Sequence, residues 1–290
     1  MSGDSSILIQ VIVSGLLMGG IYALVAIGLS LIWGVTEIVQ FAHGDFMMLA
    51  MFGAYFGWQY LNIDPTFSLP VIMGLLFILG VITYKLLISK TLYAGFIPQI
   101  FSTFGLLVFL EALAQFLWTP NFKMIENPLI KGEISIGGVF VGFPQFVACV
   151  VAIAAVIGLN WVIKKTDWGL ALQATSENKE WAALMGINSE FMFKLSWGIG
   201  SACVALAGVL LTNFFYIYPS VGLSFTMIAF VTVALGGFGS LYGTLIAALM
   251  IGLVESVGAF YVGAQYKLAL IFVLYLIVVT VRPQGLFGRY

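Results

Sequence analysis

The chain has 290 residues, of which 62% are hydrophobic and only 8% are charged, and its formal net charge is −1. Soluble domains carry charge on about a quarter of their residues, so this composition excludes an ordinary soluble protein. The near-neutral charge provides no basic surface for nucleic acid. Apolar runs of about 20 residues, the length of a membrane-crossing helix, recur along the chain without the polar–apolar alternation of barrel strands. The sequence therefore predicts an all-α, polytopic transmembrane helical bundle.

The apolar runs predict about eight or nine spans, with boundaries that are loose by several residues. The helices are expected at 7–33, 41–60, 67–89, 95–118, 139–163, 191–217, 222–236, 241–262 and 266–281. The segment 222–236 is too short to cross unless it is partly re-entrant, so we expect broken segments within the bundle. No loop could hold a soluble domain, and residues 1–290 are expected to form a single transmembrane domain.

Basic residues predict the orientation, because cytoplasmic loops of membrane proteins are enriched in Lys and Arg. Eight of them fall on one side of the predicted topology: Lys85, Lys90, Lys164, Lys165, Lys179, Lys194, Arg282 and Arg289. This side is expected to be cytoplasmic, with the N-terminus outside and the C-terminus inside. The N-terminal apolar run has no basic residues before it and is expected to be a retained first span rather than a cleaved signal peptide.

Two polar interruptions divide the apolar runs, FAHGD at 41–45 and GGFGS at 236–240. Helices are broken at membrane depth only where the freed backbone groups face protein or a water-filled cavity, and transporters use such breaks at sites and gates. The two breaks look like corresponding positions of a duplicated fold, and both are expected near the cytoplasmic side. The candidate residues of a translocation path or gate are Glu37, His43, Gly44, Asp45, Gly236, Gly237, Gly239 and Ser240.

His43 is the only histidine, and three roles are open to it. It is either a structural group bonded to a carbonyl or to Asp45, or a polar group that lines the path, or a proton relay. The relay has the least support, because no chain of intramembrane acids accompanies it. No second histidine and no cysteine pair at ligand spacing is present, so neither a metal nor another cofactor is expected. Cys149 and Cys203 lie within apolar runs, and no disulfide is expected between them.

Glu111 and Glu255 lie well inside predicted spans. Acids at membrane depth usually face the bundle interior or a cavity. Two roles stay open for these acids. They are either packing groups near helix ends, each paired with another residue or protonated, or they belong to the translocation path.

The longest polar segment on the predicted cytoplasmic side lies at about 164–190. Ser176 is placed to cap a short helix over 177–185, and Gly186 is placed to end it. Trp181, Leu184 and Met185 stand at i, i+3 and i+4 and form one apolar face on this helix. Such a helix is too short to cross a membrane, so it either lies on the lipid surface or docks into a groove of a cytoplasmic partner.

Three stretches of the sequence resemble those of one known family. The segment EWAALMG is similar to the Glu-Ala-Ala-x-x-x-Gly loop by which ABC importer permeases engage their ATPases, with Trp181 in place of the first Ala. The other two stretches are GLSLIWGVTEIVQFAHGDFMML (28–49) and VTVALGGFGSLYGTLIAALMIGLVES (231–256). Together they resemble the branched-chain amino-acid ABC transporter permeases, and the resemblance extends from about residue 15 to 286.

The resemblance implies a permease subunit of a bacterial inner-membrane ABC importer for leucine, isoleucine and valine. It also implies a homologous second permease subunit, two cytoplasmic ATPase subunits and an extracytoplasmic substrate-binding protein. Whether the permease pair is formed by identical chains is left open. The candidate residues for ATPase coupling are of two kinds. Glu180, Ala182 and Gly186 match the loop of the family, and Trp181, Leu184 and Met185 form the apolar face of the short helix.

The chain contains no G-x-x-x-x-G-K-[ST] loop, so it is not expected to be an enzyme, and ATP hydrolysis is expected in partner subunits. Three alternatives stay open: a permease for urea or short amides of the same family, a secondary transporter driven by H⁺ or Na⁺, and a passive channel. Among these classes, only an ATP-driven permease requires a docked cytoplasmic helix.

Overall fold

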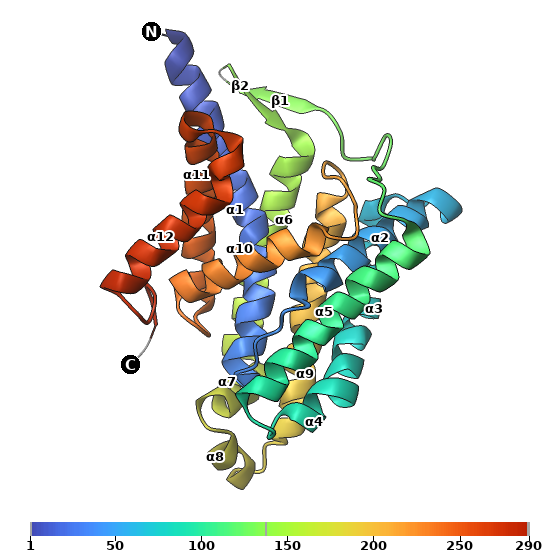
Figure 1. Cartoon of the computed structure of the whole chain (residues 1–290), viewed down its shortest axis with the longest axis vertical. Helices are drawn as coiled ribbons and strands as arrows, with labels where there is room; N and C mark the ends of the chain where they lie inside the picture. The colour runs from blue at the N-terminus through green and yellow to red at the C-terminus, as the bar shows by residue number, and fades with distance from the viewer. Residues whose placement is uncertain (1, 137, 289–290) are drawn as a thin grey trace.

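The structure is a computed structural model that describes residues 2–136 and 138–288 (Figure 1). Its centre is helix α1 (Ser2–Thr36), which runs through the molecule and is surrounded by α6 (Phe143–Lys165), α9 (Ser189–Leu211), α10 (Val221–Gly236) and α11 (Leu241–Val262). From Gly19 to Ile32, nearly every residue of α1 is buried. A helix that is apolar all round is expected to be enclosed in this way.

Six further helical segments complete the bundle. They are α2 (His43–Leu61), α3 (Pro65–Thr83), the π-helical turn η1 (Tyr84–Ile88), α4 (Ser89–Thr91), α5 (Phe96–Trp118) and α12 (Lys267–Val281), which follows the 3₁₀ turn η2 (Ala264–Tyr266). The sequence pattern predicted the helices of the bundle to within a few residues at most of their ends. The turn η1 continues α3 without a gap into α4, so the helix expected at 67–89 extends to Thr91.

Seven helices of the described residues are long and apolar enough to cross a bilayer. The other two of the nine expected helices are α2, which begins with His-Gly-Asp, and the 16-residue α10. Figure 1 shows α10 running across the long axis of α1 rather than along it. The fold class predicted from the sequence, a polytopic helical bundle with broken segments, is therefore confirmed.

Two predicted boundaries were wrong. The helix expected at 191–217 ends at Leu211, and the helix expected at 139–163 begins late. Residues 139–142 were expected to begin a transmembrane helix, but they form strand β2 (Val139–Gly142), which pairs antiparallel with β1 (Glu133–Ile136). Gly138, in the turn between the two strands, has φ +86°, and the helix α6 starts only at Phe143. The sequence VFVG is rich in β-branched and aromatic residues and is flanked by glycine, which favours a strand over a helix. Figure 1 shows the hairpin at the same end of the molecule as the N-terminus.

Glycines allow α1 and α11 to approach each other closely. A Cβ at Gly15 would lie 2.7 Å from the carbonyl oxygen of Gly252, and one at Gly19 would lie 2.9 Å from that of Ala248. Small residues four apart on each helix are the usual basis of such contacts in membranes. The outer helices α3, α5 and α12 instead expose many apolar side chains, as lipid-facing helices do.

Candidate functional site

The first polar break joins three helices. His43 begins α2 and is fully buried, with Nε2 3.0 Å from the carbonyl oxygen of Val25 on α1 and Nδ1 3.1 Å from Oε1 of Gln40. A carbonyl oxygen only accepts hydrogen bonds, so Nε2 donates to Val25 and the imidazole is held in one orientation. His43 thus makes the carbonyl contact expected of a structural histidine, and its partner is an interior turn of α1.

Gly44 allows α2 and α10 to touch. Its backbone N–H donates to Oγ1 of Thr226 over 2.9 Å, and that hydroxyl donates in turn to the carbonyl oxygen of Gly222 over 2.9 Å. A Cβ at Gly44 would lie only 2.0 Å from the Gly222 oxygen, so no larger residue fits without moving α10. The N–H of Gly44, which has no partner within the first turn of α2, is therefore satisfied by a side chain of α10.

Asp45 stands in the first turn of α2 and is buried. Among the described residues, its Oδ2 atom has no hydrogen-bond partner. Glu111, the other acid within this part of the bundle, lies on α5 and accepts a hydrogen bond from Gln115 over 3.3 Å. A buried carboxylate without a partner is costly, which makes Asp45 the least satisfied acid of the first break.

The second break, residues 236–240, connects α10 to α11. Gly237 and Gly239 have φ values of +99° and +75°, a region that favours glycine. Oγ of Ser240 accepts the backbone N–H of Gly243 over 3.2 Å and so caps α11. The break is covered by the C-terminal segment, in which the N–H of Leu286 donates to the carbonyl of Leu235 over 2.8 Å.

The two breaks lie at different levels of α1. His43 is next to Val25 and Gly28, whereas Phe238 stacks on Trp33 with ring centroids 4.6 Å apart. Gly28 and Trp33 are about 7.5 Å apart along the helix at a rise of 1.5 Å per residue. His43 therefore lies deeper in the bundle than was expected, and only the second break is near the end of α1.

Glu37 belongs to neither of the two helix breaks. It is exposed just beyond the end of α1, with φ +57°. It lines a cavity of about 300 Å³ together with residues 175–180. The structure thus places Glu37 beside the long polar loop and away from His43 and Asp45.

The long polar loop contains two short helices rather than one. They are α7 (Asp167–Glu177) and α8 (Lys179–Leu184), and Figure 1 shows them at the end of the molecule opposite the N-terminus. The predicted cap at Ser176 was wrong, because this serine lies inside α7 and its hydroxyl donates to the carbonyl of Gln173. Asn178 caps α8 instead: its extended backbone ends α7, and its Oδ1 accepts the N–H groups of Glu180 and Trp181 over 2.9 and 3.0 Å.

The end of α8 agrees with the sequence prediction. Gly186 has φ +85°, and its N–H donates to the carbonyl of Ala183 over 3.0 Å. Ala182 faces inward with 3% of its surface exposed. Trp181, Leu184 and Met185 face outward with 68%, 81% and 83% exposed. Nothing else in the described chain covers this apolar face.

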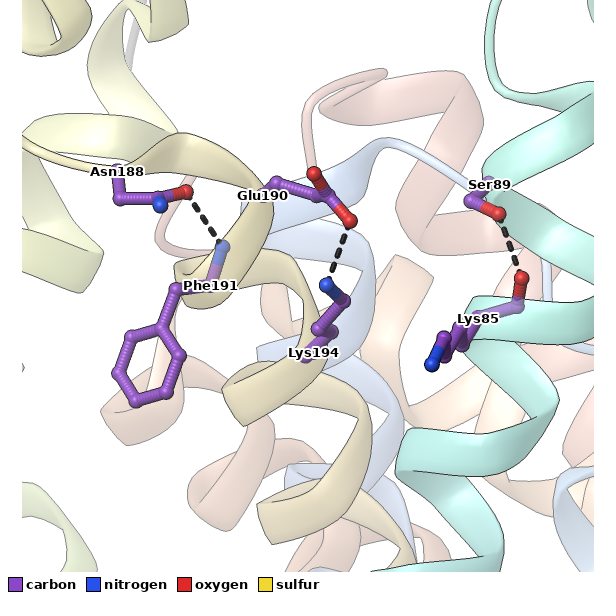
Figure 2. A network of polar contacts seen from close by, with 6 residues as sticks. All are labelled: Lys85, Ser89, Asn188, Glu190, Phe191 and Lys194. Atoms are coloured by element: carbon purple, nitrogen blue, oxygen red, sulfur yellow. Dashed lines mark hydrogen bonds and ion pairs between the residues drawn. The ribbon is translucent and has the colours of Figure 1, made fainter.

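The loop is anchored to the bundle where α9 begins. Figure 2 shows Oδ1 of Asn188 accepting the N–H of Phe191 over 3.0 Å, and the ion pair between Glu190 and Lys194. On the neighbouring helix, the hydroxyl of Ser89 donates to the carbonyl of Lys85 over 2.8 Å (Figure 2). The contacts of Asn188 and Glu190 stabilise the first turn of α9. The hydroxyl of Ser189 donates to the carbonyl of Lys179 over 3.2 Å and so joins α8 to this turn.

Glu255 is paired. The hydroxyl of Tyr22 donates to its Oε2 over 2.6 Å, and Nζ of Lys267 lies 3.2 Å from its Oε1. The sequence did not indicate these partners, because Tyr22 is 233 residues away and Lys267 reaches back only through the turn η2. Among the described residues, no group of three His, Cys, Asp or Glu side chains is placed to hold a metal ion.

A multi-pass helical bundle with a buried, internally bonded helix break and a short, exposed helix between spans is the architecture of a membrane transport permease. The family profile described as branched-chain amino acid transport system / permease component matches residues 11–281. The chain belongs to this family of permeases.

Individual relatives agree with the profile over nearly the whole chain. BraD of Pseudomonas aeruginosa, a high-affinity branched-chain amino acid transport system permease protein, is 32% identical over 97% of this chain and 96% of its own length. LivH of Escherichia coli K12 is 28% identical over 97% of this chain and 96% of its own length. The probable LivH protein of Methanocaldococcus jannaschii is 27% identical over 89% of this chain and 83% of its own length. No solved structure matches the chain.

Proposed function

We propose that this permease subunit carries leucine, isoleucine and valine across the bacterial cytoplasmic membrane, using ATP that partner subunits hydrolyse. The amino-acid class follows from the relatives, which are branched-chain amino acid permeases by name over most of the chain. In this proposal residues 1–290 act as one permease domain, paired with a homologous second permease. Two cytoplasmic ATPases and an extracytoplasmic substrate-binding protein complete the importer.

The exposed apolar face of α8 is the single observation that best supports ATP coupling. Trp181 and Leu184, in a six-residue helix, and Met185, directly after it, are exposed, and the helix is capped by Asn178 and ended by Gly186. Exposed apolar side chains on one short segment are typical of a helix that docks into a partner's groove. The alternative, a helix lying on the lipid surface, would leave an ATPase without this contact.

The other candidate residues fit a path and its gate. The joint at His43, Gly44 and Asp45 lies on the interior turns of α1, and the loop Gly236–Ser240 lies at the end of α1 that is nearer α7 and α8. We assign the first break to the translocation path and the second to a cytoplasmic gate. Movement of α8 on an ATPase would then reach the gate through α7 and α1, which are in contact.

The energy source can be tested with the complete importer in proteoliposomes that contain ATP. Leucine uptake should continue when an ionophore collapses the proton and sodium gradients, and it should stop when ATP is replaced by a non-hydrolysable analogue. Loss of uptake with the ionophore at constant ATP would overturn the proposal in favour of an ion-coupled transporter. Urea and acetamide in the same assay distinguish the substrate classes.

The orientation is tested separately with single cysteines in a variant that lacks Cys149 and Cys203. Ser176 in α7 and Asn127 in the segment between α5 and β1 are both exposed and lie on opposite sides of the proposed topology. In intact cells, Asn127→Cys should react with impermeant thiol reagents, and Ser176→Cys should react only with permeant ones. The reverse pattern would place α8 outside the cell and exclude its role in ATP coupling.

A further inference from the structure

A cavity of about 370 Å³ lies between α1, α10, α11 and the start of α12. Its volume is within the range of about 300–1,000 Å³ that is usual for small-molecule sites. The cavity contains neither of the two helix breaks. It is close to the first of them, because Tyr22 in its wall is one helical turn of α1 away from Val25, the partner of His43.

The wall combines an apolar surface with one ion pair. Met18, Phe225 and Ile228 provide part of the apolar surface. Glu255 and Lys267 provide opposite charges 3.2 Å apart, with side chains that are 13% and 48% exposed. Tyr22 holds the Glu255 carboxylate in place through its 2.6 Å hydrogen bond.

Both charged groups keep bonding capacity for a ligand. A carboxylate has about four lone-pair sites, of which Tyr22 and Lys267 occupy two. An ammonium has three donors, of which Glu255 occupies one. A ligand can therefore bind to both groups at the cavity wall without first separating them.

Adjacent opposite charges select for a dipolar ligand. A purely anionic or cationic molecule would be attracted by one member of the pair and repelled by the other, so the two Coulomb energies largely cancel. A zwitterion aligned antiparallel to the pair gains from both, with its ammonium on Glu255 and its carboxylate on Lys267. The remaining apolar wall then suits an aliphatic side chain.

We propose that this cavity is a transient binding site for a zwitterionic α-amino acid with an aliphatic side chain. This inference rests on the proposed function and goes beyond it by assigning the site and its two charged contacts. The pair is already satisfied without a ligand, so binding gains little net energy and the amino acid is released easily. A weak intermediate site of this kind suits transport, in which a ligand must leave as readily as it enters.

Protection of an introduced cysteine tests occupancy directly. Ser224 is exposed and lines the cavity. In a variant with Cys149→Ala and Cys203→Ala, we expect Ser224→Cys in the complete importer to react with a methanethiosulfonate reagent. Leucine supplied through the binding protein with ATP should slow this reaction severalfold. A cysteine at Asn127 on the loop between α5 and β1 is the control and should react equally fast with and without leucine.

Removal of the charges should abolish the protection. Glu255→Gln and Lys267→Met are each expected to lose the leucine effect on Ser224→Cys. Glu133→Gln, which removes an exposed carboxylate from β1 and does not line the cavity, is the control and should keep it. If the Glu255→Gln subunit does not accumulate in the membrane, the test relies on Lys267→Met. Lys267 is half exposed and begins α12, so this substitution should disturb folding less. In addition, Ser224→Trp should fill the cavity and block uptake while the importer still assembles.

The outcomes separate this inference from the proposed function. If the unmodified importer fails to take up leucine, the proposed function is wrong. If it takes up leucine but the reaction of Ser224→Cys is unchanged by leucine, or protection survives in Lys267→Met, the cavity is not the site. Normal uptake by Ser224→Trp would overturn the inference as well.

Discussion

Helices α1 and α8 are both rich in apolar residues but place them in opposite environments. From Gly19 to Ile32, α1 buries almost every side chain against four neighbouring helices, and small residues bring α11 into direct backbone contact. Helix α8 buries Ala182 and exposes Trp181, Leu184 and Met185. The contacts of α1 are completed within this chain, whereas the apolar face of α8 is uncovered in the described chain. Changes in α1 should therefore affect folding, and changes in α8 should affect assembly.

The largest expected effect is on the contact between α1 and α11. Gly252→Leu should prevent stable insertion, because a Cβ at this position would already lie 2.3 Å from the carbonyl oxygen of Gly15. Overpacking of this kind costs about 1–3 kcal/mol or more. The amount of subunit in the membrane and its thermal unfolding in detergent measure the effect. Gly158→Leu on α6 is the control, since no atom lies within 4 Å of a Cβ there. Equal loss in both variants would contradict a specific close contact.

A smaller effect is expected at the joint of α1, α2 and α10. His43→Ala removes the hydrogen bond to Val25 and leaves a buried carbonyl without that donor, at a cost of about 1–3 kcal/mol. We expect reduced uptake and a lower unfolding temperature, while the subunit still inserts and still binds the ATPase. Uptake, unfolding and co-purification are measured on the same samples. Loss of ATPase binding together with normal unfolding would contradict the separation between α1 and α8.

A still smaller change in energy is expected at the end of α8. Gly186→Val should strain the backbone by about 1–2 kcal/mol, because valine resists a positive φ, although the space around the residue is open. Coupling between substrate and ATP hydrolysis should fall, with normal insertion. Gly186→Asn tolerates this conformation better and should retain most of the coupling. Equal activity of the valine and asparagine variants would show that the backbone conformation of Gly186 does not matter.

The sequence allowed the bundle to be predicted because long apolar runs determine helices almost independently of tertiary context. The hairpin over 133–142 was missed because four-residue strands give too short a pattern and glycine can end either kind of element. The cap of α8 was misplaced by two residues, since both Ser176 and Asn178 are good capping residues and only the fold decides between them.

The contacts of the candidate sites were beyond sequence reasoning. Gly44 meets Thr226 across 182 residues, and Glu255 meets Tyr22 across 233. The sequence identified Gly44 and Glu255 as unusual residues in apolar segments, but their partners are ordinary hydroxyl residues in other helices. Only the packing of α2 against α10 and of α1 against α11 brings these groups together.

Association of the ATPase with Trp181→Ala tests the role of α8 most directly. Large aromatic anchors at interface centres often contribute about 2 kcal/mol or more. Loss of this contribution should weaken ATPase binding by roughly thirtyfold, since each 1.4 kcal/mol is about a factor of ten. Trp161→Ala, which removes another exposed tryptophan from the membrane helix α6, should bind as the unmodified subunit does. Wild-type ATPase binding and substrate-stimulated hydrolysis in Trp181→Ala would contradict docking through α8 and favour a helix that lies on the lipid surface.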